Sequence, residues 1–231
     1  MTEAGSLIWE FGPPEAMEER RRTRSGWRPD RLRRPGLGPE TVIDVGAAVG
    51  TAELYEAFPD AHLVLIEPLS ECREQLEQWL STHDGELVES AVGSREGTIE
   101  MLVDREAPWV SSILRPVRPR DGSAPVKRTV PITTLDRLHE QRGWKGPFGL
   151  KLDSEGFELE IVKGATRLLA ETQFVVAEVS VAPRFEGGYT FAEFVALMDQ
   201  RGFALCDVLD GWKARPAGNL IFLDALFHRA R

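Results

Sequence analysis

The sequence predicts an α/β fold in which a mostly parallel sheet is covered by helices on both faces. Short β-rich segments alternate with amphipathic helical segments from residue 41 onward, which is typical of parallel strands joined by helices. The β-rich segments are continuous apolar runs, as expected for strands that are buried on both faces. The last two of these segments have no helix between them, so we expect the final strand to run antiparallel.

Seven segments are predicted to be strands of this sheet: 41–45, 62–66, 86–92, 148–153, 173–179, 203–210 and 219–227. Amphipathic patterns predict helices over 70–82 and from Thr190 onward, where Thr190 and Glu193 have the spacing of a capping box. Two more strands are expected at 97–103 and 126–133. The loop between them, 104–125, is long for a compact domain, so we interpret it as a substrate lid, with an ordinary insertion as the alternative.

Composition and charge exclude several classes of protein. The chain has 231 residues and a net charge of −9, which makes general nucleic-acid binding a poor candidate. No apolar run approaches the roughly 20 residues of a membrane span. The N-terminus has no basic start or apolar stretch of a secretory signal, and two cysteines form neither a disulfide framework nor a zinc pattern. We therefore expect a cytoplasmic protein.

The first 40 residues form an arginine-rich arm ahead of a domain at 41–231. Eight arginines lie within residues 20–34: Arg20, Arg21, Arg22, Arg24, Arg28, Arg31, Arg33 and Arg34. One interpretation is a solvated, partly helical arm. The other is a docking surface for an anionic substrate or for a second subunit, so a homo-oligomer stays open.

The first predicted strand runs into a turn that contains glycines. Asp44 is followed by Gly46 and Gly50, whereas the dinucleotide fingerprint G-x-G-x-x-G would need a glycine where the chain has Ala48. A carboxylate before the turn repels a pyrophosphate and favours a cationic amino-acid group. S-adenosylmethionine has an ammonium and a sulfonium and no phosphate, so the motif favours this cofactor over NAD. A turn without any ligand is the alternative.

Two further strand ends offer groups for the same cofactor. Glu67 ends the second strand and is followed by Pro68, and an acid at this position can accept hydrogen bonds from both ribose hydroxyls. The alternative is a carboxylate that stabilises the start of the next helix. Ala91 and Val92 end the third strand, where small apolar residues can line the adenine ring.

The run from Leu150 to Ala165 carries the strongest signal. A strand brings Asp153 to the carboxyl edge of the sheet, where open α/β sheets bind ligands. Lys151 lies on the same strand face as Asp153, and Glu178 lies near the end of the neighbouring strand, about 5 Å away. These two carboxylates can hold Mg²⁺ or share a proton so that one acts as a base. A structural ion pair of Lys151 with Asp153 or with Glu178 is the alternative.

The order of these motifs resembles that of the FkbM family of S-adenosylmethionine-dependent methyltransferases. The similar runs are VIDVGAAVGTAE, LIEPL, SAVGSREGTIEMLV, Ser111-Ser112, VPITTLDRL and KLDSEGFELEIVKGA, and they cover about residues 40–180. The resemblance implies the Rossmann-like class I methyltransferase fold and methylation of a hydroxyl on a sugar or natural product. It also implies cofactor contacts from Asp44, Gly46, Ala47, Gly50 and Glu67.

We therefore expect an O-methyltransferase that uses S-adenosylmethionine and acts on a small-molecule hydroxyl. The expected catalytic residues are Asp153, Glu178 and Lys151, with Asp153 and Glu178 as the ligands of a Mg²⁺ ion if one is used. Thr51, Pro68, Ala91, Val92 and Asp153 complete the expected cofactor contacts. A nucleic-acid methyltransferase that uses the arginine-rich arm, and an NAD-binding α/β domain, remain as alternatives.

Overall fold

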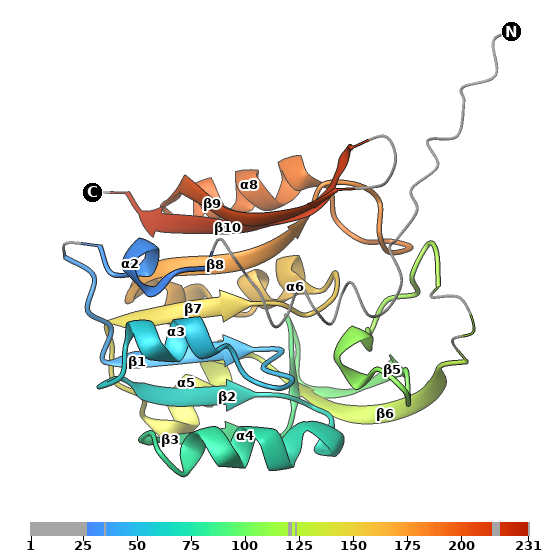
Figure 1. Ribbon diagram of the computed structural model, residues 1–231, viewed down its shortest axis with the longest axis horizontal. Helices are drawn as coiled ribbons and strands as arrows, with labels where there is room; N and C mark the ends of the chain where they lie inside the picture. Colours follow the sequence, from blue (N-terminus) through green and yellow to red (C-terminus); the bar gives the residue numbers. More distant parts are fainter. Residues whose placement is uncertain (1–26, 35, 120–121, 123, 214–217, 231) are drawn as a thin grey trace, which may run out of the picture.

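A seven-stranded sheet forms the centre of the computed structural model, which describes residues 27–34, 36–119, 122, 124–213 and 218–230 (Figure 1). The strand order is β3-β2-β1-β7-β8-β10-β9. All neighbours are parallel except β10, which is antiparallel to both β8 and β9. The strands are β1 Thr41–Val45, β2 His62–Ile66, β3 Gly85–Val88, β7 Phe148–Leu152, β8 Thr172–Ser180, β9 Phe203–Lys213 and β10 Leu220–Arg229. The predicted fold class, with its antiparallel last strand, is confirmed.

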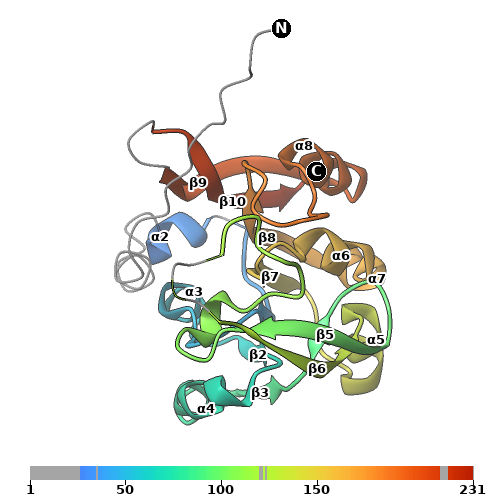
Figure 2. The ribbon, with the colours of Figure 1, turned by 90° about the vertical axis from the view of Figure 1, so that its right-hand side faces the viewer.

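Helices cover both faces of the sheet, as the end-on view in Figure 2 shows. One face is covered by α2 Pro29–Leu32, α3 Ala52–Ala57 and α4 Arg73–Leu80. The other is covered by α5 Leu135–Arg142, α6 Glu158–Lys163, α7 Thr166–Ala170 and α8 Phe191–Gln200. A 3-10 turn, η1 Ser70–Cys72, precedes α4, so the helix predicted over 70–82 exists in two pieces. The capping box of Thr190 and Glu193 starts α8 as predicted.

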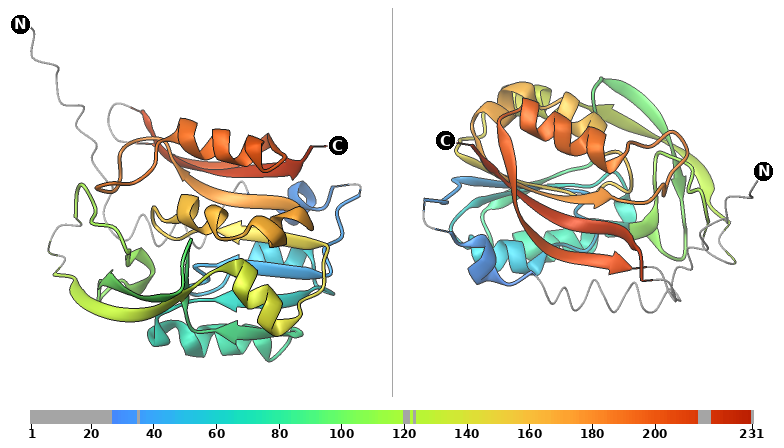
Figure 3. Two further views of the ribbon diagram at one scale, coloured as in Figure 1. Left: turned by 180° about the vertical axis from the view of Figure 1, so that it is seen from behind. Right: turned by 90° about the horizontal axis from the view of Figure 1, so that it is seen from above.

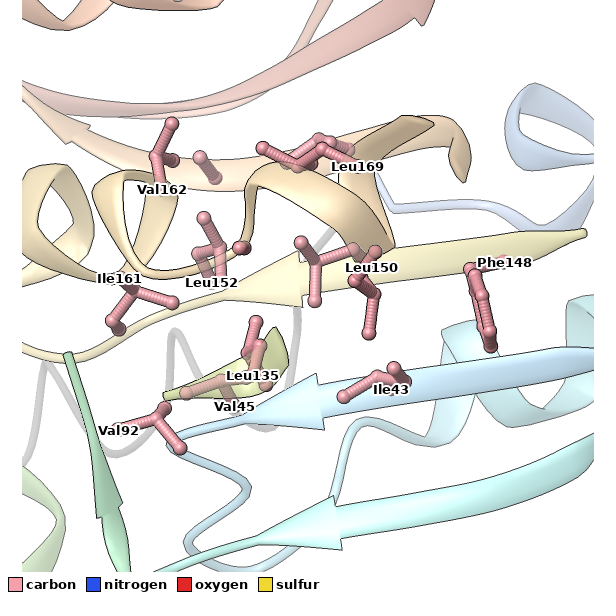
Figure 4. Packing of buried hydrophobic residues seen from close by; sticks show 14 of the residues in the cluster. Ile43, Val45, Val92, Leu135, Phe148, Leu150, Leu152, Ile161, Val162 and Leu169 are labelled. Atoms are coloured by element: carbon pink, nitrogen blue, oxygen red, sulfur yellow. The ribbon is translucent and has the colours of Figure 1, made fainter. Parts of the chain in front are cut away.

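Successive side chains of each strand point to opposite faces of the sheet. Both faces are buried, which explains the continuous apolar sequences of the strands. Ile43, Val45, Leu150 and Leu152 pack toward the α5–α8 face, together with Val162 of α6 (Figure 4). Apolar strand residues on the other face pack toward α2, α3 and α4, among them Val42, Leu63, Leu65 and Val176. Two apolar layers therefore hold the sheet rigid, and the strand ends that carry the polar residues are fixed in position by this core.

The segment 86–92 is not one strand, and this corrects the prediction. β3 ends at Val88, and the chain turns at Ser90, whose hydroxyl donates to the Ala91 carbonyl at 2.8 Å. Ala91–Val92 then form β4 of a second sheet of order β4-β6-β5. The apolar run continues across the turn because both pieces are buried, so composition alone does not reveal the change of sheet.

The second sheet stands beyond the carboxyl ends of the parallel strands (Figure 1). Its long strands, β5 Gly97–Val103 and β6 Val126–Thr133, pair antiparallel and have the predicted bounds. The connection between them contains the 3-10 turn η2 Pro108–Val110. Because the second sheet stands at the carboxyl edge of the main sheet, the loop from β5 to β6 lies near the strand ends where we expect the site residues (Figure 1).

The described part of the arm contains α2 and packs against the face of the domain that carries α3, as the rear and top views also show (Figure 3). Trp27 is buried and its indole Nε1 donates to Asp224 at 2.8 Å. Arg31 and Arg34 pair with Asp207 at 2.7 and 2.5 Å, and Arg33 donates to the Ala57 carbonyl at the end of α3. Arg20, Arg21, Arg22 and Arg24 lie outside the described residues. Within the described ranges, no helix is both long and apolar enough to cross a membrane.

Candidate functional site

The turn after β1 presses directly against the end of β7. Gly46 has a φ of +69°, a conformation that favours glycine, and its amide donates to the Ile66 carbonyl at 3.0 Å. A Cβ added at this position would lie 1.9 Å from the Asp153 carbonyl oxygen. Glycine is therefore required here by the contact between two strand ends of the protein itself, whatever ligand the turn approaches.

The end of the same turn is held by an aromatic side chain. Gly50 has a φ of +94°, and a Cβ there would lie 2.2 Å from the Trp79 Nε1 atom. That indole nitrogen donates to the Val49 carbonyl at 3.1 Å, and the Trp79 ring packs edge-on against Tyr55. The helix α4 thus fixes the shape of the turn from outside the sequence motif.

Glu67 joins the end of β2 to the glycine turn. Its carboxylate accepts hydrogen bonds from the amides of Ala48 at 3.1 Å and Leu69 at 3.0 Å, and the side chain is buried. Ala48 has a φ of +49°, an unusual conformation that this bond helps to hold. A carboxylate offers about four acceptor positions, so this geometry suits a residue that both shapes the turn and faces the pocket.

Two pockets flank the turn and share Gly46, Ala48 and Asp153. The first lies between the main sheet, β4 and the 104–125 loop, and of the expected site residues it is lined by Gly46, Glu67, Pro68, Ala91, Val92 and Asp153. The second lies at the start of α3, and it is lined by Gly46, Ala47, Gly50, Thr51, Lys151 and Asp153. Asp44 and Glu178 line neither of these two pockets.

Asp44 lies behind the turn in a buried ionic network. It is fully buried, pairs with the Lys151 ammonium at 2.9 Å and accepts a hydrogen bond from the Tyr55 hydroxyl at 2.6 Å. Burial and the Asp44 charge raise the pKa of Tyr55 well above its usual value. Lys151 also reaches the Gly46 carbonyl at 3.1 Å and the Asp153 carboxylate at 3.5 Å. Lys151 therefore ties the ends of β1 and β7 together.

Three carboxylates gather at the ends of β7 and β8. Asp153, Glu155 and Glu178 each place an oxygen within 4.8 Å of the other two, so the predicted proximity of Asp153 and Glu178 is correct. The guanidinium of Arg184 bridges two of these acids, at 2.6 Å from Glu178 and 2.5 Å from Glu155. The ion pair between Lys151 and Glu178 that we considered is absent among the described residues, because Arg184 takes that place.

A fourth carboxylate lies beneath this cluster. Glu158 is buried at the start of α6, where it accepts hydrogen bonds from the Ser154 amide at 2.7 Å and from the Tyr189 hydroxyl at 2.8 Å. Burial raises its pKa to about 7, and the charge of Glu178 acts in the same direction. Its bonds to Ser154 and Gly156 fix the turn that carries Glu155.

Sequence reasoning assigned no role in the site to Arg184, Tyr189, Glu155 or Glu158. Arg184 follows β8 in a loop without any motif, and its two partners lie 6 and 29 positions away in the chain. Only the crowding of acids after β7 signals that a cation must lie nearby. Trp109, which lines the first pocket from the 104–125 loop, was missed for the same reason.

Comparison with solved structures agrees with the fold. The chain is similar to a magnesium protoporphyrin IX methyltransferase from Synechocystis PCC 6803, with 9% identity, coverage of 96% of this chain and 87% of that one, and a TM-score of 0.51. A precorrin-6y C5,15-methyltransferase from Geobacter metallireducens GS-15 has 11% identity, coverage of 96% and 95%, and a TM-score of 0.49. No curated protein sequence matches the chain.

The family is shown by a match that contains both halves of the site. The model described as "Methyltransferase FkbM domain" matches residues 44–205, from Asp44 at the end of β1 into β9, which is well over half of the chain. This range includes the glycine turn, Glu67, Asp153 and Arg184. The chain therefore belongs to the FkbM methyltransferase family and is a methyl-transferring enzyme.

Proposed function

We propose that the enzyme transfers the methyl group of S-adenosylmethionine to a hydroxyl of a small molecule such as a sugar or natural product. The observation that carries the proposal is the first pocket, whose wall contains Glu67 on one side and Asp153 and Glu155 on the other. One pocket thus joins the strand end suited to the ribose with the strand end that carries possible bases.

The residues present suit the cofactor. The carboxylate of Glu67 is aligned by two backbone amides and can accept from the ribose, and Pro68, Ala91 and Val92 provide a mainly apolar wall for an aromatic ring. The second pocket, at Thr51 and Lys151, offers polar groups for the methionyl end. S-adenosylmethionine supplies an electrophilic methyl carbon, and the protein must hold a hydroxyl in line with it.

Asp153 is the best-placed group to take the hydroxyl proton. It lines both pockets, lies 3.5 Å from the Lys151 ammonium and has Glu155 as its neighbour on the pocket wall. A positioned base of this kind contributes about 10²–10⁴-fold to a rate. The four histidines line neither pocket, so a carboxylate is favoured over an imidazole.

Mg²⁺ on Asp153 and Glu178 is the second form of this proposal, since three carboxylate oxygens converge there. Arg184 already provides a positive charge to Glu178 and Glu155 at hydrogen-bond distance, which favours the metal-free form. Chelation by EDTA separates the two forms. Unchanged turnover supports the base alone, and abolished turnover that Mg²⁺ restores supports the metal.

Methylation of nucleic acid through the arm receives less support from the contacts. Arg31 and Arg34 pair with Asp207, and Arg33 binds main-chain carbonyls of α3, so these guanidinium groups are already engaged within the chain.

We place the reaction in the cytoplasm, consistent with two free cysteines. The 104–125 loop, from which Pro108, Trp109, Ser111 and Ile113 line the first pocket, is the proposed substrate lid.

The test is a methyl-transfer screen with labelled S-adenosylmethionine against sugars, glycosides and aromatic alcohols, with amines and RNA as comparison acceptors. We expect label only in hydroxyl compounds, as an ether stable to base. Label only in amines or RNA overturns the hydroxyl proposal. Calorimetry with S-adenosylmethionine and NAD checks the cofactor separately, and binding of NAD alone overturns that assignment.

A further inference from the structure

We propose that Arg184 is a positioning residue of the methyl-transfer site, which holds Glu155 and Glu178 in place and ties them to the loop that covers the pocket. This inference deepens the proposed function. Arg184 is not among the residues that line the two pockets, so its effect on the reaction would pass through the carboxylates and the loop.

The first argument is the setting of the guanidinium. Arg184 is buried, and its two terminal nitrogens each donate to a different carboxylate, Glu178 at 2.6 Å and Glu155 at 2.5 Å. Its guanidinium lies over the rings of Phe222 at 4.3 Å and Phe185 at 5.0 Å. A planar, two-pronged group between aromatic rings has little freedom, so it sets the separation of the two acids as a lysine would not.

The second argument is the strained backbone of Glu155. This residue has a φ of +47°, which is unfavourable for a side chain with a Cβ, and such a conformation persists only where neighbours enforce it. Arg184 holds its carboxylate, and the Ser112 hydroxyl donates to its carbonyl at 2.7 Å. Glu155 lines the pocket beside Asp153, so these contacts determine the shape of the pocket wall.

The third argument is the connection to the loop. The Arg184 carbonyl accepts from the Val117 amide at 2.8 Å, and the Glu186 amide donates to the Arg115 carbonyl at 2.8 Å. These bonds flank a bridge between Pro116 and Phe185. Segment 184–186 and segment 115–117 therefore form a short antiparallel pair. Arg184 therefore holds the loop with its main chain and the two carboxylates with its side chain.

The experiment compares Arg184→Met and Arg184→Lys with Arg229→Met in the full chain. Arg229 is the control, because its guanidinium also stacks on a phenylalanine, Phe203 at 4.6 Å, but donates to the Thr172 and Leu169 carbonyls, outside both pockets. Hydrogen exchange of the Val117 and Glu186 amides needs no acceptor. We expect exchange to become about tenfold faster in Arg184→Met and to stay unchanged in Arg229→Met. Equal effects in both variants overturn the connection to the loop.

The kinetic readout uses the acceptor found in the screen. We expect Arg184→Met to lower kcat about 30-fold, with the affinity for S-adenosylmethionine within threefold of wild type, and Arg184→Lys to recover part of the loss. Arg184→Met should lower kcat by a smaller factor in the Glu155→Gln background than in wild type, because the effects of substitutions at two interacting residues are not additive. Full additivity, or a change in cofactor affinity alone, overturns the positioning role. If the screen finds no hydroxyl acceptor, the proposed function is wrong. The hydrogen-exchange result still tests the connection between Arg184 and the loop, because it needs no acceptor.

Discussion

The two halves of the site are built in different ways. At the ends of β1 and β2, the site consists mainly of one short turn and the carboxylate of Glu67. This carboxylate accepts hydrogen bonds from two backbone amides, which lie two and 19 positions away from it in the chain. At the ends of β7 and β8, the site is a network of charged and polar side chains that includes Arg184 and Tyr189 from the loop that follows β8. A turn of backbone suits a fixed ligand shape, whereas a charged network suits proton movement, because protonation changes its energy strongly.

Asp153→Asn tests the charged half and should have the largest effect. We expect turnover to fall about 10³-fold, since the amide cannot accept the proton, while the fold survives because Lys151 keeps its 2.9 Å pair with Asp44. Steady-state kinetics and thermal unfolding measure the two outcomes. A variant with a lower melting temperature and normal turnover would show that Asp153 is only a structural partner of Lys151. Asp207→Asn, remote from the pockets, is the control.

Gly46→Ala tests how tightly the two halves are joined. Gly143 has the same φ of +69° but open space where a Cβ would lie, so Gly143→Ala reports the conformational cost alone, about 1 kcal/mol. Gly46→Ala adds a collision with the Asp153 carbonyl, and we expect a total of about 3 kcal/mol in urea unfolding. Equal costs at the two positions would contradict the close contact. A larger residue at 46 is therefore a poor probe of ligand approach.

Glu67→Ala tests the backbone-built half. We expect the affinity for S-adenosylmethionine to fall about 30-fold, from the loss of ribose hydrogen bonds worth about 2 kcal/mol together. Glu67→Gln is the control for turn shape, because its one oxygen can still accept from an amide, and it should lose less. Calorimetry measures both. A fall of less than threefold in the alanine variant would leave Glu67 with only its contacts to Ala48 and Leu69.

Glu158 concerns stability alone, and its effect is confined to a limited range of pH. Its pKa is raised from 4.5 to about 7, so the folded state holds the proton more tightly than the unfolded state. The resulting stability is complete below about pH 4.5 and is lost as the pH rises to about 7, by at most about 1.4 kcal/mol per pH unit. The difference in unfolding free energy between wild type and Glu158→Gln should fall over that range. A flat difference would show that folding does not raise the pKa of Glu158.

Much of the fold was predictable because it depends on local patterns. Apolar runs long enough to be buried on both faces located the seven main strands, and the short connection before the last strand settled its direction. Periodicity and a capping box located α8. The split of 86–92 was not predictable, since a buried residue in either sheet has the same apolar character.

The sequence by itself determined which residues reach the carboxyl edge of the sheet, because strand direction and the two-residue period place Asp44, Glu67, Lys151 and Asp153 there. Only the tertiary structure decided what each of them touches. Asp44 turned out to lie behind the turn on Lys151, and Arg184 came from an unmarked loop to pair with Glu155 and Glu178. The physical reason is that a buried charge must find an opposite charge or a hydrogen-bond partner in space, and that partner need not be near it in the chain.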